Sequence, residues 1–203
     1  MLTGNKPDKE MERVFDVCLI LHADHTFNAS TFAAREVAST RAHMYSAVSA
    51  AVGALSGELH GGANYEVMKM LLDIKDENNA TNWVKSKIEN GDRIMGMGHA
   101  VYKTVDPRSM VLKELSKKLS EKTGLPWYDI TKKVEETTSE IMKNRKERDI
   151  FPNVDLYSAS VYYMLNIPMD LNTPIFAISR VSGWAAHVIE EKFAEAAPKP
   201  MLY

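Results

Sequence analysis

Three short segments of the sequence place a histidine or an aspartate in a turn just before or at the start of a helix. They read LHGGAN around His60, GMGHAVYKTVDPR around His99 and FPNVD around Asp155, where Asn153 is expected to be the N-cap of the helix. The N–H groups at a helix start carry a partial positive charge, which favours a neutral histidine and a negatively charged acid. Neutral histidines can donate hydrogen bonds, and a carboxylate can accept a proton. The set therefore suits proton abstraction next to a carbonyl group.

Two arginines in the sequence suit a carboxylate ligand. Asp106 is expected to cap a helix that begins at Pro107, which puts Arg108 in the first turn beside free N–H groups. Arg180 lies in an apolar helical segment, where a charge needs a partner, and Gly183 allows close packing there. Each feature also has a purely structural interpretation. Arg108 could pair with a neighbouring acid, His60 could cap a turn, and Asp155 could only stabilise a helix start.

Other functional classes fit the sequence less well. GMGH lacks the third glycine of a dinucleotide-binding loop. HADH contains His22 and His25, which could share a helix face, but no further ligands of convincing spacing follow, so a zinc site is a poor hypothesis. His43 and His187 lie in segments that we expect to be helical, and no role is assigned to them. We expect no metal and no nucleophilic cysteine or serine.

Composition and charge argue against further classes of protein. The 203 residues have a formal net charge of −2 and show no basic stripe, so nucleic acid is not an expected partner. No apolar run is long enough for a membrane span, and the N-terminus does not read as a signal peptide, so we expect a cytoplasmic protein without a membrane partner. Cys18 is the only cysteine and is expected to be a buried thiol in a reducing compartment.

Helical spacing of apolar residues predicts an all-α fold. Helices are expected over residues 9–21, 30–57 and 64–75, and Thr173 and Pro174 should open another that runs to about residue 197. Buried faces are predicted at Val111, Leu115 and Leu119; at Ile130, Val134, Ile141 and Met142, in a helix that opens with Pro126; and at Val154, Tyr157, Val161 and Met164. Residues 111–150 are rich in Lys and Glu, as solvated helix faces are. Residues 44–63 are small and almost uncharged, which indicates a buried or subunit-interface helix.

In order along the chain, HADH, LHGGAN, GMGHAVYKTVDPR, FPNVD and ISRVSGW resemble the citrate synthases. The likeness runs from about Val17 to Ile189 and is specific, because these motifs in this order are hard to obtain by chance. It looks closest to the shorter bacterial and archaeal forms, and the 2-methylcitrate synthases share the scaffold. The resemblance implies a two-domain helical fold, with residues 61–163 as the small domain and residues 1–60 and 164–203 as part of the large domain.

The resemblance also implies a reaction that needs no cofactor. Acetyl-CoA and oxaloacetate would condense in a Claisen-type step, and thioester hydrolysis would then give citrate and CoA. Asp155 would remove a proton from the acetyl methyl group. His60 would donate a hydrogen bond to the thioester oxygen, and His99 would bind the ketone oxygen of oxaloacetate.

The substrate contacts that the resemblance implies form two sets. Oxaloacetate would be held by His25, His99, Arg108 and Arg180. CoA would lie along the glycine turn of residues 94–98, and its contacts would be Ile94, Met95, Gly96, Met97, Gly98 and Ala100. Lys103, Lys146 and Arg148 are weaker candidates for the CoA phosphates, because solvated charges are the commoner case.

The chain departs from the family at both ends. It begins where the family is already midway, and it stops at Tyr203 before an Arg-Pro whose arginine reaches the partner's active site. We therefore expect the C-terminal half of a citrate synthase that forms a homodimer when complete. Two alternatives stay open: a 2-methylcitrate synthase that uses propionyl-CoA, and an inactive truncated chain that keeps the fold.

Overall fold

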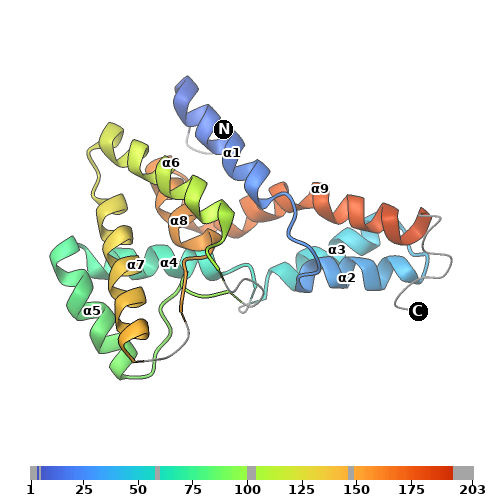
Figure 1. The fold of residues 1–203 in the computed structure, drawn as a ribbon. Helices are drawn as coiled ribbons and strands as arrows, with labels where there is room; N and C mark the ends of the chain where they lie inside the picture. Colours follow the sequence, from blue (N-terminus) through green and yellow to red (C-terminus); the bar gives the residue numbers. More distant parts are fainter. Residues whose placement is uncertain (1–3, 5, 58–59, 100–103, 146–148, 194–203) are drawn as a thin grey trace. The chain divides into compact units, whose positions relative to one another are not determined.

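A computed structural model describes residues 4, 6–57, 60–99, 104–145 and 149–193. Regular structure within these ranges is helical, so the all-α prediction is confirmed (Figure 1). None of the helices that the structure describes is both long and apolar enough to cross a membrane. In chain order the elements are α1 (Lys9–His22), α2 (Ala29–Ser39), α3 (Met44–Leu55), α4 (Ala63–Ile74), α5 (Glu77–Glu89), α6 (Pro107–Thr123), α7 (Trp127–Asn144), α8 (Val154–Met164), the short 3₁₀ helix η1 (Met169–Leu171) and α9 (Asn172–Phe193).

The chain divides into two compact units. Unit 1 consists of Met1–Phe15 and Ala63–Asn172, and unit 2 consists of Asp16–Gly62 and Thr173–Tyr203. The domain boundaries implied by the resemblance stay a prediction. Both units draw on distant parts of the sequence, so motifs that belong to the same unit are brought together by packing and not by sequence proximity.

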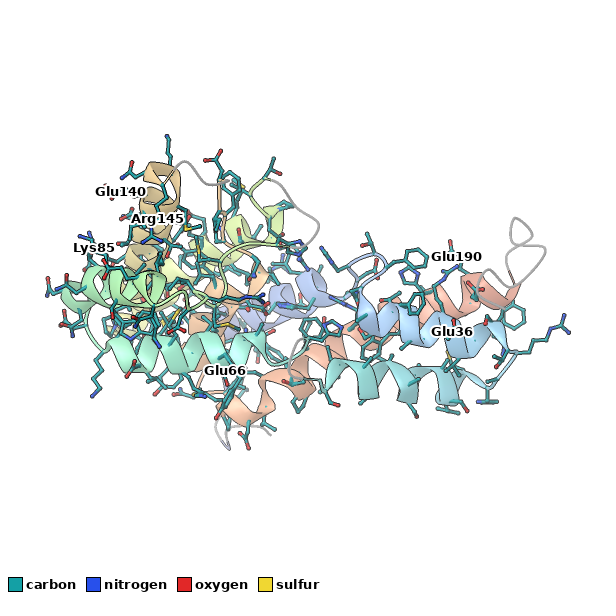
Figure 2. The ribbon with its side chains drawn as sticks, turned by 90° about the horizontal axis from the view of Figure 1, so that it is seen from below. Glu36, Glu66, Lys85, Glu140, Arg145 and Glu190 are labelled. Atoms are coloured by element: carbon teal, nitrogen blue, oxygen red, sulfur yellow. The ribbon has the colours of Figure 1, made fainter. Side chains whose placement is uncertain are left out.

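Helix α8 is the central element of unit 1. Helices α4, α6 and α7 all pack against it, and α5 packs against α7 and α4. The predicted α8 face of Val154, Tyr157, Val161 and Met164 is buried as expected. The charged outer faces are solvated, as shown by exposed Lys85 on α5 and Glu140 on α7 (Figure 2). The start of α8, which carries Asp155, is therefore fixed by packing along the rest of the helix.

Unit 2 has a core of small residues. Alanines of α2 and α3 let the two helices approach closely, and two large residues of α9 complete the cluster. Its buried members are Ala34, Ala38, Ala47, Ala51, Leu55, Trp184 and Val188. The opposite side of α3 is open in this chain, since Tyr45 is 78% and Val52 44% exposed. The small-residue segment is thus buried on one face only.

Several predicted helix boundaries are wrong. The helix expected over 30–57 is two helices, separated where Thr40 caps α2, Arg41 takes a left-handed φ of 65° and His43 caps α3. His43 is therefore a cap and not a helical residue, and neither glycine nor proline marks the break. Pro126 precedes α7 as its N-cap instead of opening it. Helix α5 was not predicted, because its buried residues are only Ala80 and Val84.

The start of α9 and the buried face of α6 also differ from the predictions. Helix α9 begins at Asn172, so Thr173 does not cap it; the Thr173 hydroxyl donates to the Gly61 carbonyl at 2.9 Å. In α6 the buried residues include Leu112 and Leu119, whereas Val111 is 42% exposed. The spacing of three apolar residues fixed the helical period but not which side faces the core.

Neighbouring residues of α6 give a direct test of that core face. Leu112→Ala should lower the free energy of unfolding by about 2–5 kcal/mol, because it leaves a cavity in a fully buried site. Val111→Ala should lower it by less than about 1 kcal/mol, because Val111 is 42% exposed and loses fewer buried contacts. Urea unfolding followed by circular dichroism measures both. Equal losses for the two variants would show that the core face of α6 has been misassigned.

Candidate active site

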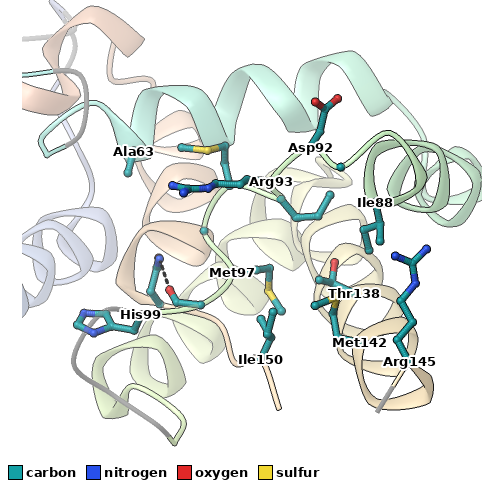
Figure 3. Close-up of a pocket in the computed structure, with 16 residues that line it drawn as sticks. Ala63, Ile88, Asp92, Arg93, Met97, His99, Thr138, Met142, Arg145 and Ile150 are labelled. Carbon is teal, nitrogen blue, oxygen red and sulfur yellow. Dashed lines mark hydrogen bonds between the residues drawn. The ribbon is translucent and has the colours of Figure 1, made fainter. Parts of the chain in front are cut away.

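Unit 1 contains a cavity of about 670 Å³ beside the glycine turn (Figure 3). Its walls come from the starts or ends of several helices and from the loops between them. The lining residues are Ala63, Ile88, Gly91, Asp92, Arg93, Ile94, Met95, Gly96, Met97, Gly98, His99, Thr138, Met142, Arg145, Ile150 and Asn153. The five residues Ile94–Gly98 that were predicted to contact CoA are thus brought together on one cavity. Ala100, Lys103, Lys146 and Arg148 lie outside the described residues.

The glycine turn is hydrogen-bonded to the segment that precedes α8. The Gly98 N–H donates to the Phe151 carbonyl at 2.7 Å, and the Asn153 N–H donates to the Gly96 carbonyl at 2.9 Å. Between these bonds, Met97 and Pro152 form an isolated antiparallel bridge. The GMGH and FPNVD motifs, more than fifty residues apart in sequence, are therefore held side by side.

The two glycines of this turn are needed for different reasons. Gly96 has a φ of 78°, and a Cβ there would lie 2.9 Å from the Cα of Leu156, so only glycine allows this approach to α8. Gly98 has a φ of 87°, but the space beside it is open. An open backbone next to the cavity is what close contact with a ligand requires.

Asn153 joins the glycine turn to the start of α8. Its Oδ1 accepts the Asp155 N–H at 2.9 Å, which confirms the predicted N-cap, and its Nδ2 donates to the Gly98 carbonyl at 3.0 Å. Together with its backbone N–H, this side chain fixes both Asp155 and the turn that ends at His99. The sequence showed the cap but gave no signal of the second bond.

Asp106 and Arg108 form a bidentate pair at the start of α6. Asp106 caps the helix as predicted, accepting the Arg108 N–H, and its two oxygens also accept from Arg108 Nε at 3.0 Å and Nη2 at 2.7 Å. The structure therefore shows the acid-paired arrangement that sequence analysis had left open. Three further N–H hydrogens of the guanidinium are not used by this pair, so it does not exclude a carboxylate ligand.

The environment shifts the pKa values of this group. Burial raises the pKa of Asp106, but the hydrogen bonds and charge of Arg108 outweigh it and hold the pKa below its usual value. Burial lowers the pKa of His99 below its usual value; the charge of Asp106 opposes this shift, and that of Arg108 adds to it. His99 is therefore neutral at physiological pH, as the proposed hydrogen-bond donor must be.

His60, in unit 2, is held by Ser30. The Ser30 backbone N–H donates to His60 Nε2 at 3.3 Å, and the Ser30 Oγ lies 2.9 Å from the same nitrogen. Trp184 Nε1 donates to that Oγ at 3.1 Å. Because a backbone N–H can only donate, Nε2 acts as an acceptor and the neutral ring carries its hydrogen on Nδ1. Neither Ser30 nor Trp184 was singled out from the sequence, since both contacts span distant segments.

Burial, followed by the charge of Arg180, lowers the pKa of His60. The predicted neutral state is therefore supported, although the main cause is burial and not the helix start. Phe176 links the two residues: its ring meets that of His60 edge-on at 6.2 Å, and the Arg180 guanidinium lies 4.6 Å from its centre. The buried Arg180 also donates through Nε to the His22 carbonyl at 2.7 Å.

His22 and His25 of the HADH segment do not share a helix face, which was the arrangement considered for a zinc site. Helix α1 ends at His22, whose Nδ1 lies 2.8 Å from the Cys18 carbonyl, and His25 lies in the turn that follows. The described residues contain no group of three His, Cys, Asp or Glu side chains placed to hold a metal ion. Cys18 is buried as predicted, and burial raises the pKa of its thiol to about 12.

Comparisons with known proteins identify relatives of the whole chain. The family model for the C-terminal domain of citrate synthase matches residues 1–200. A citrate synthase of Haloferax volcanii is 48% identical over 193 residues, which are 94% of this chain and 49% of that protein. A 2-methylcitrate synthase of Shewanella oneidensis is 44% identical over 192 residues, which are 95% of this chain and 50% of that protein.

A solved structure gives the same assignment. It is a ternary complex of carboxymethyl coenzyme A and oxaloacetate with citrate synthase from Thermoplasma acidophilum, with a TM-score of 0.88 and 37% identity. The match covers 98% of this chain and 52% of the solved one. The chain thus spans about half the length of the relatives it matches.

The double role of Asn153 can be tested with an isosteric change. Asn153→Asp keeps an oxygen that caps α8, but it replaces the donor to Gly98 with an acceptor. We expect the free energy of unfolding to fall by about 1–3 kcal/mol and amide exchange in residues 96–99 to accelerate. Asn82→Asp makes the same chemical change at an exposed site of α5 and is the matched control. Indistinguishable behaviour of the two variants would contradict the role given to Asn153.

The Asp106–Arg108 pair predicts a pH-dependent stability. A carboxyl whose folded pKa lies below its unfolded pKa adds stability above the unfolded pKa, and this stability is lost as pH falls through the folded pKa. Asp106→Asn keeps the cap oxygen but loses the charge, so it should cost about 1–3 kcal/mol at pH 7. The gap from wild type should narrow below about pH 4. Urea unfolding from pH 7 to 3 measures it, and a gap that stays constant would refute the ion-pair explanation.

Proposed function

Since the chain belongs to the citrate synthase family, we propose that it is the C-terminal part of an enzyme that condenses acetyl-CoA with oxaloacetate and releases citrate and CoA. The observation that carries the proposal is the pairing of the GMGH and FPNVD motifs beside the unit 1 cavity. It puts the carboxylate of Asp155 at a helix start and the neutral His99 on a neighbouring segment, and His99 lines a cavity large enough for a substrate.

Asp155 is the proposed general base. It lies in the first turn of α8, where the partial charge of the helix stabilises its ionised form, and Asn153 fixes the backbone beneath it. The ionised carboxylate takes a proton from the methyl group of acetyl-CoA. CoA itself lies along Ile94–Gly98, where Gly98 leaves the backbone accessible.

His60 is the proposed donor to the thioester oxygen as the enol forms. Its neutral state and the hydrogen on Nδ1 suit this role, because a neutral donor stabilises developing negative charge without first binding as a cation. His99 polarises the ketone of oxaloacetate in the same neutral form. Arg108 and Arg180 bind its carboxylates, with Asp106 holding Arg108 in place. His25 also contacts oxaloacetate.

The domain and assembly assignments are part of the same proposal. Residues 61–163 form the small domain, residues 1–60 and 164–203 belong to the large domain, and the complete protein is a homodimer. The exposed side of α3, with Tyr45 and Val52, supports a further contact surface on this helix.

A second candidate differs only in the acyl donor. The Shewanella oneidensis 2-methylcitrate synthase is almost as similar to this chain as the Haloferax volcanii citrate synthase is, at 44% against 48% identity. Propionyl-CoA would replace acetyl-CoA, and the residues proposed for oxaloacetate would keep their roles.

The decisive measurement is the release of CoA thiol by this chain, with acetyl-CoA or propionyl-CoA and with or without oxaloacetate. We expect release that requires oxaloacetate, and a loss of about 10²–10⁴-fold in Asp155→Asn, which removes the base but keeps the shape. The preferred acyl donor separates the two candidates. Release without oxaloacetate would contradict condensation. A folded chain that neither binds oxaloacetate nor releases thiol would refute the proposal for this chain.

A further inference from the structure

One face of α9 holds the end of α1 and the segment that links α1 to α2. Ser179 Oγ donates to the Leu19 carbonyl, and Arg180 Nε donates to the His22 carbonyl at 2.7 Å. At Gly183 a Cβ would overlap the Ala23 carbonyl oxygen and lie 2.9 Å from Asp24 Oδ1. Backbone contact this close indicates that α9 determines the path of residues 22–25.

His187, one turn beyond Gly183, reaches the side chain of Asp24. Its Nε2 lies 3.1 Å from Asp24 Oδ1, and its Nδ1 lies 3.2 Å from Arg35 Nη1. A guanidinium has only donors, so Nδ1 accepts and the ring hydrogen is on Nε2, where it donates to Asp24. The histidine thus has a defined orientation and a defined tautomer.

Arg35 fixes His187 from the buried side. Its Nη2 pairs with Glu191 at 2.7 Å and its Nη1 with Glu190 at 2.5 Å, so the guanidinium cannot move without breaking a buried ion pair. Figure 2 shows Glu190 on α9. The Phe27 ring covers the group, 4.7 Å from the Arg35 guanidinium and 5.5 Å from the His187 ring. Phe27, which belongs to the segment that links α1 to α2, is therefore part of the cluster that fixes His187.

Asp24 connects His187 to the turn around His25. Its Oδ2 accepts the Thr26 N–H at 3.4 Å, and Thr26 has a φ of 50°. A β-branched residue rarely adopts this left-handed conformation, so contacts around it must hold it there. On the other side, Asn28 Nδ2 donates to the His25 carbonyl at 3.1 Å.

We propose that His187 is a positioning residue, which acts through Asp24 to hold the turn that presents His25. The inference rests on the proposed function only for the identity of the ligand, since His25 is there proposed to contact oxaloacetate. No role was predicted for His187 from the sequence, because its partners Asp24 and Arg35 are distant along the chain.

The test uses the whole 203-residue chain and two readouts. His187→Phe keeps a ring but removes the donor and the acceptor, and Asp24→Ala breaks the same contact from the half-exposed side. Amide exchange of residues 23–27 should accelerate at least about tenfold in both variants, and oxaloacetate affinity by calorimetry should fall by about as much. The affinity for acetyl-CoA should stay within about twofold, a split that a general loss of folding would not give.

Two further variants serve as controls. His187→Gln retains an N–H for Asp24 and should restore exchange and affinity to within about threefold of wild type. Glu190→Gln removes the exposed charge of the same cluster but keeps an amide oxygen for Arg35 and leaves the buried Arg35–Glu191 pair and the Asp24–His187 contact in place, so it should behave like wild type. If His187→Phe does not fold, Asp24→Ala decides the question.

The outcomes separate the two claims. Unchanged exchange in the broken-contact variants overturns the positioning role, and faster exchange with unchanged oxaloacetate affinity overturns its link to the ligand. If the wild-type chain binds no oxaloacetate, the proposed function of this chain fails. The exchange data still decide whether His187 holds the turn.

Discussion

The pairing of residues 96–98 with residues 151–153 is the constraint on which the unit 1 site depends. This pairing holds the turn that ends at His99 and the helix that begins near Asp155 in a fixed relative position. Asn153 contributes hydrogen bonds from its backbone N–H, its Oδ1 and its Nδ2, so one residue holds the two segments together. Gly96 is then required by packing, because the turn lies directly on α8 at Leu156.

Both candidate hydrogen-bond donors are neutral for the same physical reason. Burial disfavours the charged imidazolium of His60 and of His99, and a nearby arginine adds to the effect in each case. The arginines thus have two consequences: they offer N–H groups to an anionic ligand, and they keep the neighbouring histidine uncharged. The hypothesis drawn from helix starts predicted the neutral state, but burial and the arginine charges lower the two pKa values.

The sequence predicted what depends on local chemistry. Asp106 and Asn153 are caps because a side-chain oxygen precedes a run of helical spacing, and the α8 face was correct because its apolar residues are closely spaced. It did not predict the break at Arg41, where the local residues carry no turn signal, or the buried side of α6, where both Val111 and Leu112 are apolar. Ser30, Trp184 and His187 were missed because their roles arise only from tertiary contacts.

Helix α9 shows how one element can serve both a core and a site. Phe176, Arg180, Trp184 and His187 recur at intervals of three or four residues, with Gly183 beside Trp184, so they lie along one stripe of the helix. Trp184 belongs to the alanine-rich core and also donates to the serine that holds His60. A rotation or shift of α9 would therefore move the supports of His60 and of the His25 turn together. The packing of the unit 2 core and the positions of His60 and His25 thus depend on the same helix.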